Sequence, residues 1–509
     1  MIPINQLRLQ PAEIFKSDDM GKKLAGKTVR GGVNTMGAQG ALFVLNLGRT
    51  IVLARLLTPQ DFGLIGMVMV VISFATMFKN AGLNMATVQR AEINHDQIST
   101  LFWINVLISL GLGLCIVAGA PLVASFYDRP ELTAVTMVLA ISFVIQGLTI
   151  QHAALLRRHM RFDILAIQQV LAAAVSLTVA ITLAFLGWRY WALVGGTVAS
   201  AITMVLLTYF FCPWQPGIIK RGTGVLEMLK FGGHITGFNF VNYFARNADN
   251  ILIGKFIGAD GLGVYAKAYQ LYMMPIRQMR SPLAQVAMPV LCSLKNDPPR
   301  YIKYYKNIVD MLSTLMIPFA FYCALEADFL INLILGEKWL AAVPVFRVLA
   351  IGGVVISVAG TRGLVLKSRG YSKRYFYWGL FNAIVTVSSF LIGVQFGIVG
   401  VAIAYTTATY LILLPSLFYC FHKTPISITL FFGALTPSLV NATIAAAALL
   451  VLRYVIASHS LVDHLLYTLT FSIIYSGLTL SRRPIRKNFS LVCKGVPLLQ
   501  LLPRNTGHQ

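Results

Sequence analysis

The chain has 509 residues, of which 57% are hydrophobic and only 12% are charged. Soluble proteins of average composition carry about twice that share of charged residues, so the composition excludes an ordinary soluble protein and predicts an integral membrane protein. The net charge is +24, from 42 Lys and Arg against 18 Asp and Glu. Because the basic residues lie in short patches between apolar runs, they favour contact with the inner leaflet and argue against nucleic acid as a partner.

The first residues, 1–32, are polar and basic, and they lack the apolar core of a cleaved signal peptide. We therefore expect them to stay in the cytoplasm. The stretch that begins at Met20, Met-Gly-Lys-Lys-Leu-Ala-Gly-Lys, resembles a natural start. We expect residues 1–19 to be dispensable, or the true start codon to be the one at Met20.

Apolar runs of about 20 residues, the length that crosses a hydrocarbon core, predict fourteen transmembrane helices. They lie near 33–56, 62–80, 98–124, 132–151, 164–186, 190–212, 230–254, 266–290, 304–325, 342–366, 375–394, 398–421, 428–452 and 462–480. The predicted fold is an all-α polytopic membrane protein with two pseudo-symmetric six-helix bundles and two C-terminal helices. No loop between spans exceeds roughly twenty residues, which is too short for a soluble catalytic domain.

The positive-inside rule sets the orientation of these spans. With the N-terminus inside, the inner loops and termini hold most of the Lys and Arg outside the spans, and the outer loops hold few. This alternation holds at every loop. Both termini are therefore predicted to be cytoplasmic. The expected parts are a cytoplasmic N-terminal segment, an N-lobe, a cytoplasmic linker, a C-lobe, two further spans and a basic cytoplasmic tail: 1–32, 33–212, 213–229, 230–421, 422–480 and 481–509.

An internal repeat supports the division into two lobes. A shift of 200 residues places four positions on equivalent residues: Gly32, Gly37, Ile51 and Gly63 on Gly232, Gly237, Ile251 and Gly263. Arg55 falls on Lys255 in the same alignment. Both copies start inside, so the pattern predicts a parallel repeat about an axis along the membrane normal, with a substrate path between the lobes.

The predicted seventh span, 230–254, carries a polar stripe. Its polar residues recur at three- and four-residue spacing, which places them on one helix face: Asn239, Asn242, Arg246, Asp249 and Asn250. A charge at the bilayer centre costs at least about 2.5–3.5 kcal/mol on insertion scales, so such residues usually face a cavity or a partner. The stripe predicts the lining of a hydrophilic cavity. An Arg246–Asp249 pair that serves only helix packing remains the alternative.

The first span also has a polar face, formed by Gln39, Asn46 and Arg49 at seven- and three-residue spacing. Arg49 has no acidic residue nearby in the sequence. We expect it to line the same cavity, and a structural arginine bound to a carbonyl or to Asp249 is the alternative.

Two further spans contain arginine. In the eighth, Arg277 and Arg280 lie one turn apart between Pro275 and Pro282, where a kink frees backbone carbonyls. The alternative for this pair is snorkelling toward lipid phosphate. In the tenth, we expect Arg362 to lie deep in the membrane.

An excess of arginine over acid in the spans predicts an anionic passenger, because guanidinium groups bind phosphate through two hydrogen bonds. Asp310 in the ninth span is interpreted as a partner for an arginine, or as a proton or cation site.

Ten aromatic residues at predicted span ends favour an interfacial belt over sugar stacking: Tyr265, Tyr269, Tyr272, Tyr301, Tyr304, Tyr305, Tyr371, Tyr375, Tyr377 and Trp378.

The sequence contains no catalytic triad, paired-glutamate motif or phosphate-binding glycine loop in a suitable setting. The six cysteines lack CxxC spacing, so neither a metal site nor a disulfide framework is predicted. We expect no enzyme activity and no cofactor.

Two stretches resemble a known family. Residues 49–63, Arg-Thr-Ile-Val-Leu-Ala-Arg-Leu-Leu-Thr-Pro-Gln-Asp-Phe-Gly, and residues 245–275, which include Ala-Arg-Asn-Ala-Asp-Asn-Ile-Leu-Ile-Gly-Lys-Phe-Ile-Gly, are similar to the polysaccharide-transporter family. These are Wzx-type flippases of lipid-linked oligosaccharides, and the resemblance is to their colanic-acid and exopolysaccharide branch. It covers about residues 20–480.

The resemblance implies the fold of the multidrug/oligosaccharidyl-lipid/polysaccharide exporter superfamily and alternating access between two bundles. It implies an undecaprenyl-pyrophosphate-linked repeat unit as substrate, the bacterial inner membrane as location, and a polysaccharide polymerase and a chain-length regulator as partners. The substrate-binding residues that we expect are Asn46, Arg49, Asn242, Arg246, Asp249, Asn250, Arg277, Arg280 and Arg362.

Three other functions remain open at this point. A multidrug/cation antiporter of the same superfamily would need carboxylates for ion exchange, but the first span carries Arg49 and no acid. A membrane enzyme such as a polymerase or ligase would need a sizeable outer loop or a polar catalytic cluster. A peptidoglycan-precursor flippase is chemically closer, although the motifs resemble the exopolysaccharide branch better.

Overall fold

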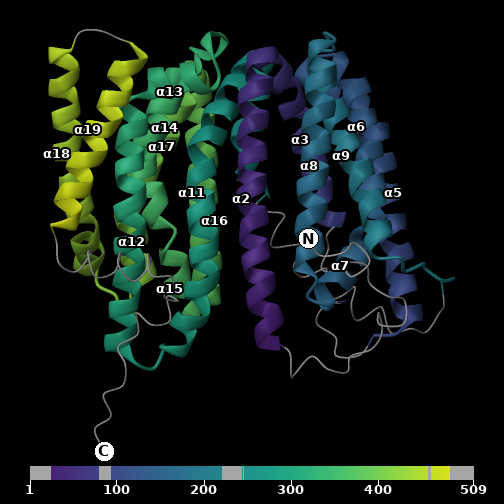
Figure 1. Cartoon of the computed structure of the whole chain (residues 1–509), viewed down its shortest axis with the longest axis horizontal. Helices are drawn as coiled ribbons and strands as arrows, with labels where there is room; N and C mark the ends of the chain where they lie inside the picture. Colours follow the sequence, from purple (N-terminus) through teal and green to yellow (C-terminus); the bar gives the residue numbers. More distant parts are fainter. Residues whose placement is uncertain are drawn as a thin grey trace, which may run out of the picture. The chain divides into compact units, whose positions relative to one another are not determined.

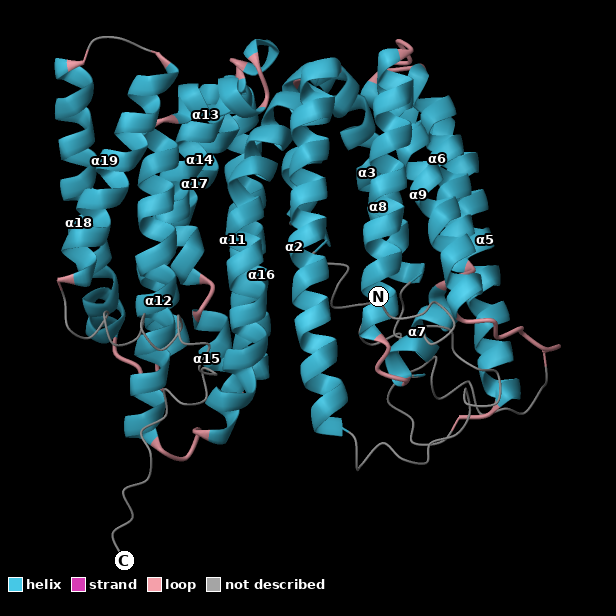
Figure 2. Cartoon of the chain, viewed as in Figure 1, coloured by secondary structure: helices cyan, strands magenta, loops and turns pink. Residues whose placement is uncertain are grey.

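The computed structural model describes residues 24–79, 87, 93–219, 243–244, 246–456 and 460–481. Within these residues the regular structure is entirely helical, as Figure 2 shows. The chain divides into two compact units: residues 1–263 with 334–338, and residues 264–333 with 339–509.

The first unit is a bundle of long helices from the N-terminal half (Figure 1). Within it α8 packs against α9 and α2, and α6 packs against α5 and α9. Residues 246–256 form a further helix, and the first turn of α11 also belongs to this unit. The bounds are α2 (Leu24–Leu56), α3 (Pro59–Lys79), α5 (His95–Tyr127), α6 (Glu131–Gly147), α7 (Ile150–Arg158), α8 (Phe162–Phe185), α9 (Tyr190–Phe211) and α11 (Ala259–Ser293).

The second unit contains the rest of α11 and the C-terminal helices. Its α12 packs against α14 and α18, α16 packs against α17, and α18 packs against α19. The bounds are α12 (Pro298–Leu325), α13 (Ala327–Ile334), η2 (Glu337–Trp339), α14 (Ala342–Ala359), α15 (Arg362–Ser368), α16 (Ser372–Gly393), η3 (Val394–Phe396), α17 (Gly397–Phe421), α18 (Ile428–Val455) and α19 (Leu461–Leu480).

The helix bounds follow from local chemistry. At the start of α3, the carboxylate of Asp61 accepts hydrogen bonds from the backbone N and from Oγ1 of Thr58, at 2.9 and 2.7 Å. Pro59 occupies the first helical position, where its missing N–H costs nothing. At the start of α19, Ser460 and Asp463 form a capping box, in which the side chain of each residue accepts a hydrogen bond from the backbone N of the other.

The multi-span membrane architecture is confirmed. Eleven segments of the described residues are long and apolar enough to cross a membrane, and one of them, Ser372–Phe421, contains both α16 and α17. The run expected at 266–290 is helical within α11, although α11 is not among these segments. The run expected at 230–254 lies largely outside the described residues, so the total of fourteen stays a prediction. The same holds for the linker at 213–229, which the structure describes only to residue 219.

Two predicted spans are divided in the structure. The run at 132–151 becomes α6 followed by α7, and the run at 342–366 becomes α14 followed by α15. The second division falls at Gly360 and Thr361, between helices that end at Ala359 and begin at Arg362. This break places an arginine at a point where the helix is interrupted.

The interpretation of the aromatic residues as an interfacial belt is wrong for several of them. Tyr265, Tyr272, Tyr301 and Tyr305 are among the largest fully buried side chains of the described residues. On α12, Tyr301 and Tyr305 repeat at a four-residue interval that continues into a buried apolar stripe, so these rings form helix-packing core.

Candidate functional site

The break between α14 and α15 brings together two of the predicted arginines, Arg280 from α11 and Arg362 from α15. The guanidinium group of Arg280 lies directly against Gly360, because a Cβ at that position would be 1.8 Å from its Nη2 atom. Any larger residue at position 360 would therefore displace the guanidinium group. Nη1 of Arg280 donates to the carbonyl oxygen of Ile356 at 3.3 Å.

Arg362 is held from the other side of the same break. Its Nε donates to the carbonyl oxygen of Ala359 at 2.7 Å, and its guanidinium carbon lies 6.0 Å from the centre of the Trp378 ring. Its Nη1 atom is buried and has no hydrogen-bond partner in the structure. Arg362 and Arg280 are close enough to repel each other electrostatically.

This arrangement can bind an anion. Among the described residues no carboxylate forms an ion pair with Arg362, so its buried Nη1–H remains available to an incoming oxygen. Two guanidinium groups of like charge that lie near each other are stabilised when an anion lies between them, and phosphate oxygens match their hydrogen-bonding geometry. We call Arg280 and Arg362 the arginine pair.

The predicted residues of the first span lie on α2 in the first unit. Asn46 is exposed and Arg49 is half-buried, three residues apart and therefore on one face of the helix. No described residue forms a hydrogen bond or ion pair with the Arg49 side chain. The backbone carbonyl of Asn46 accepts a hydrogen bond from Thr50 Oγ1 at 2.9 Å.

The seventh-span residues are divided in their exposure. Arg246 is exposed, Asn250 is half-buried and Asp249 is buried on the helix of residues 246–256. The Oδ1 atom of Asp249 accepts from the backbone N of Asn250 at 2.8 Å. Among the described residues no ion pair joins Arg246 to Asp249. Asn242 lies outside the described residues.

The remaining predicted residues belong to the second unit. Arg277 on α11 is exposed, unlike its neighbour Arg280. Asp310 on α12 is half-buried, and no arginine among the described residues forms an ion pair with it. Its interpretation as a partner of one of these arginines is therefore not supported by a contact.

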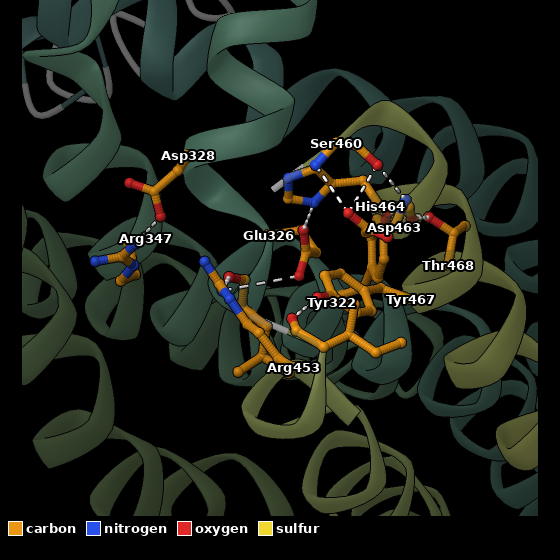
Figure 3. A network of polar contacts seen from close by, with 12 residues as sticks. Tyr322, Glu326, Asp328, Arg347, Arg453, Ser460, Asp463, His464, Tyr467 and Thr468 are labelled. Atoms are coloured by element: carbon orange, nitrogen blue, oxygen red, sulfur yellow. Dashed lines mark hydrogen bonds and ion pairs between the residues drawn. The ribbon is translucent and has the colours of Figure 1, made fainter. Parts of the chain in front are cut away.

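Sequence reasoning missed a buried charged cluster that joins α12, α18 and α19 (Figure 3). The side chain of Glu326, which has no exposed surface, lies at the end of α12. Its Oε2 atom is 2.7 Å from Nδ1 of His464, and its Oε1 atom is 3.8 Å from Nη1 of Arg453. Arg453 also donates to the carbonyl oxygen of Leu325 at 3.2 Å. We call Glu326, Arg453 and His464 the α12–α19 cluster.

Aromatic and hydroxyl groups complete the surroundings of this cluster. The ring of Phe329 stacks on His464 with 4.1 Å between centroids. Tyr322 and Thr468 share a hydrogen bond of 2.6 Å between their hydroxyl groups, and Tyr467 donates to the carbonyl of Ile456 at 2.9 Å. Figure 3 shows Tyr322, Tyr467 and Thr468 near the carboxylate of Glu326. No local spacing in the sequence could have indicated the cluster, because its members come from three separate helices.

Lys79 is a second residue whose position the sequence did not indicate. The structure leaves only 4% of it exposed at the end of α3. Its Nζ lies 3.4 Å from the carbonyl oxygen of Phe143 and 4.3 Å from the centre of the Phe143 ring. This position is a buried cation held by a carbonyl dipole and an aromatic face.

Comparison with known proteins gives consistent matches. Residues 52–344 match the family described as "Polysaccharide biosynthesis protein". The teichuronic acid biosynthesis protein TuaB of Bacillus subtilis is 28% identical over 347 residues, which cover 64% of this chain and 70% of that protein. The lipopolysaccharide biosynthesis protein WzxC of Escherichia coli is 25% identical over 391 residues, covering 75% of this chain and 78% of that one.

A solved structure shows the same fold. The lipid II flippase MurJ, in an inward closed conformation, superposes with a TM-score of 0.72. The match covers 88% of this chain and 98% of that protein at 14% sequence identity. At this identity the similarity establishes the fold only.

Proposed function

Because the chain belongs to the polysaccharide biosynthesis protein family, we propose that it is a flippase for undecaprenyl-pyrophosphate-linked oligosaccharide repeat units. It carries them across the bacterial inner membrane for exopolysaccharide or lipopolysaccharide biosynthesis. The names of its relatives, which concern teichuronic acid and lipopolysaccharide biosynthesis, support this class of substrate. Its multi-span architecture and its fold, which it shares with a lipid II flippase, are those of a transporter.

The observation that carries the proposal is the unpartnered Nη1 of Arg362 beside Arg280. A cationic drug would be repelled from this arginine pair, whereas a pyrophosphate group would neutralise it. In a site of low dielectric constant the attraction between guanidinium and phosphate is stronger than in water. The arginine pair therefore favours an anionic lipid head over the cations that an antiporter exports.

The other predicted residues take supporting roles in this proposal. Arg49 and Arg246 bind the pyrophosphate as the head moves, and Arg277 draws it from the membrane surface. Asp249 and the amide side chains bind sugar hydroxyl groups; these amides are Asn46, Asn242 and Asn250. The prenyl tail remains in lipid, so that only the polar head crosses the low-dielectric barrier.

Alternating access between an N-lobe of residues 33–212 and a C-lobe of residues 230–421 completes the proposal. The positive-inside pattern supports cytoplasmic termini, and the tail of residues 481–509 would then face the inner leaflet. A polysaccharide polymerase and a chain-length regulator would take over the delivered repeat unit outside.

The test is to delete the gene and measure two quantities together: surface polysaccharide, and lipid-linked repeat units accessible from the cytoplasmic face. The proposal expects export to stop while the inward-facing intermediate accumulates. Complementation with Arg362→Ala should restore export only to a level about 10- to 100-fold below that of the wild type at normal protein abundance. If export and intermediates are unchanged by the deletion while drug efflux falls, the antiporter replaces the flippase.

A matched control variant comes from the preceding helix. Arg347 on α14 is exposed and already forms an ion pair with Asp328. Arg347→Ala removes the same charge from the same part of the chain, and it should leave export near the wild-type level. Loss of export in both variants would mean that the overall positive charge matters rather than the arginine pair.

A further inference from the structure

The internal repeat of the sequence reappears as a reciprocal contact between helices in the first compact unit. A Cβ on Gly63 of α3 would lie 1.7 Å from the carbonyl oxygen of Ala259 at the start of α11. A Cβ on Gly263 would lie 1.8 Å from the carbonyl oxygen of Pro59 at the start of α3. Since 63 and 59 become 263 and 259 under the 200-residue shift, each copy of the repeat makes the same contact with the other.

Backbone lies directly on backbone at this crossing, which we call the glycine crossing. Pro59, Gly63, Ala259 and Gly263 are all buried. Because a methyl group at either glycine would overlap a carbonyl oxygen, no other residue fits without moving one helix. Small residues allow two helices to touch without interlocked side chains. Such a contact can part and re-form as a unit, because no side chain has to be withdrawn from a pocket.

The polar contacts around the glycine crossing follow the same symmetry. Lys255 Nζ lies 2.9 Å from Asp128 Oδ2, which follows α5 in the first repeat. Lys338 Nζ, in η2 after α13 in the second repeat, donates to the carbonyl oxygen of Arg55 at 3.1 Å. Positions 55 and 255 are again equivalent under the shift, so each repeat is tied to a loop of the other.

The contacts Lys255–Asp128 and Lys338–Arg55, which we call the rim ties, lie at the surface. The Asp128 side chain is 79% exposed, and the contact between Lys338 and Arg55 is also exposed. Water can replace such contacts at little cost, and salt screens them. The crossing is therefore buried at its centre and held only by weak, exposed polar contacts at its rim, a combination suited to a contact that opens and closes.

We propose that the glycine crossing is the outer gate of the transport cycle. This inference rests on the proposed function and on the orientation from the positive-inside pattern, which places the ends of α2, α3 and α11 that meet here outside. The contact is closed while the substrate site faces inward. The N-terminal ends of α3 and α11 then part, and the polar head of the lipid-linked substrate is released outside. The rim ties hold the gate shut until the substrate is loaded.

The experiment tests whether the rim must open. Asp128→Cys and Lys255→Cys are combined in a chain whose six native cysteines are replaced, and the pair is joined by a short, reducible, thiol-specific cross-linker. Export should fall at least tenfold on cross-linking and return on reduction, while inward-facing intermediate accumulates. Each single-cysteine variant, treated in the same way, should keep its export. Normal export by a fully cross-linked protein would overturn the gate.

A second pair of variants tests the crossing itself. Gly63→Ala and Gly263→Ala should each lower the yield of the rim cross-link and the rate of export, because the added methyl group holds the helices apart. Gly48→Ala on α2 is the matched control, since nothing lies within 4 Å of the position of its Cβ. Equal cross-linking in all three variants would contradict the proposal. If the untreated double-cysteine chain restores neither export nor turnover of the intermediate to a deletion strain, the proposed function fails first.

Discussion

The imidazole Nδ1 of His464 lies 2.7 Å from the carboxylate Oε2 of Glu326, and this contact joins residues 138 positions apart. It connects the end of α12 to the first turn of α19. Because the Glu326 side chain has no exposed surface, its charge depends on His464 and Arg453 for compensation. The contact therefore fixes the C-terminal helix pair, α18 and α19, to the rest of the second unit.

Removing this carboxylate should loosen the C-terminal helices. Glu326→Ala should lower the free energy of unfolding by about 1–3 kcal/mol, because His464 and Arg453 lose a charged hydrogen-bond acceptor. Glu326→Gln retains an acceptor oxygen and should cost less. Thermal unfolding of the purified protein in detergent measures both. Glu337 is exposed, so Glu337→Ala should change stability by no more than about 0.5 kcal/mol. Equal loss in all three variants would refute a special role for the cluster.

The arginine pair should act as one site. Arg280→Ala and Arg362→Ala should each reduce export about 10- to 100-fold, the equivalent of one charged hydrogen bond of about 1.5–3 kcal/mol. The double variant should lose less than the sum, because both groups bind the same anion. A double-mutant cycle on initial export rates provides the measurement, with protein abundance checked in each strain. Strict additivity would assign the two arginines to separate sites.

The buried Lys79 should be dispensable for folding. No carboxylate forms an ion pair with it in the described residues, so Lys79→Met removes a desolvated charge and retains an apolar side chain of similar length. We expect the free energy of unfolding to rise by about 1 kcal/mol. Lys306→Met is the exposed control, with an expected change within about 0.5 kcal/mol. If Lys79→Met is destabilising, the contacts with Phe143 outweigh the cost of burying the charge.

The backbone conformation of Met160, directly after α7, predicts the effect of a glycine substitution on stability. Met160 follows α7 with a φ of 55°, in the left-handed region, where Arg161 N donates to the carbonyl of Leu156 at 2.9 Å. A side chain in this region costs roughly 1–2 kcal/mol per residue. Met160→Gly should therefore stabilise the protein by about 1 kcal/mol in thermal unfolding. The opposite sign is expected for Met69→Gly, in the interior of α3, which should cost about 1 kcal/mol.

The membrane helices were predictable because apolar length is a local signal. So was the repeat, whose matched Gly63 and Gly263 meet the same kind of backbone carbonyl in the structure. The break at Gly360 was not predicted, because the apolar run continues across it. The α12–α19 cluster was not predictable either, since Glu326 and His464 are ordinary polar residues until the helices pack. Nine candidate site residues were named from the sequence, and packing brings two of them, Arg280 and Arg362, to one helix break.

Three prolines interrupt α11, and their spacing has a mechanical consequence. Pro275, Pro282 and Pro289 follow one another at seven-residue intervals, close to two full turns, so they lie on nearly the same side of the helix. Each proline removes one intrahelical hydrogen bond, so bending at the three positions would add in one direction instead of cancelling. The helix is therefore expected to bend preferentially in a single plane. Arg280 lies between the first two prolines, so flexure of α11 in this plane moves its guanidinium group relative to the helix ends.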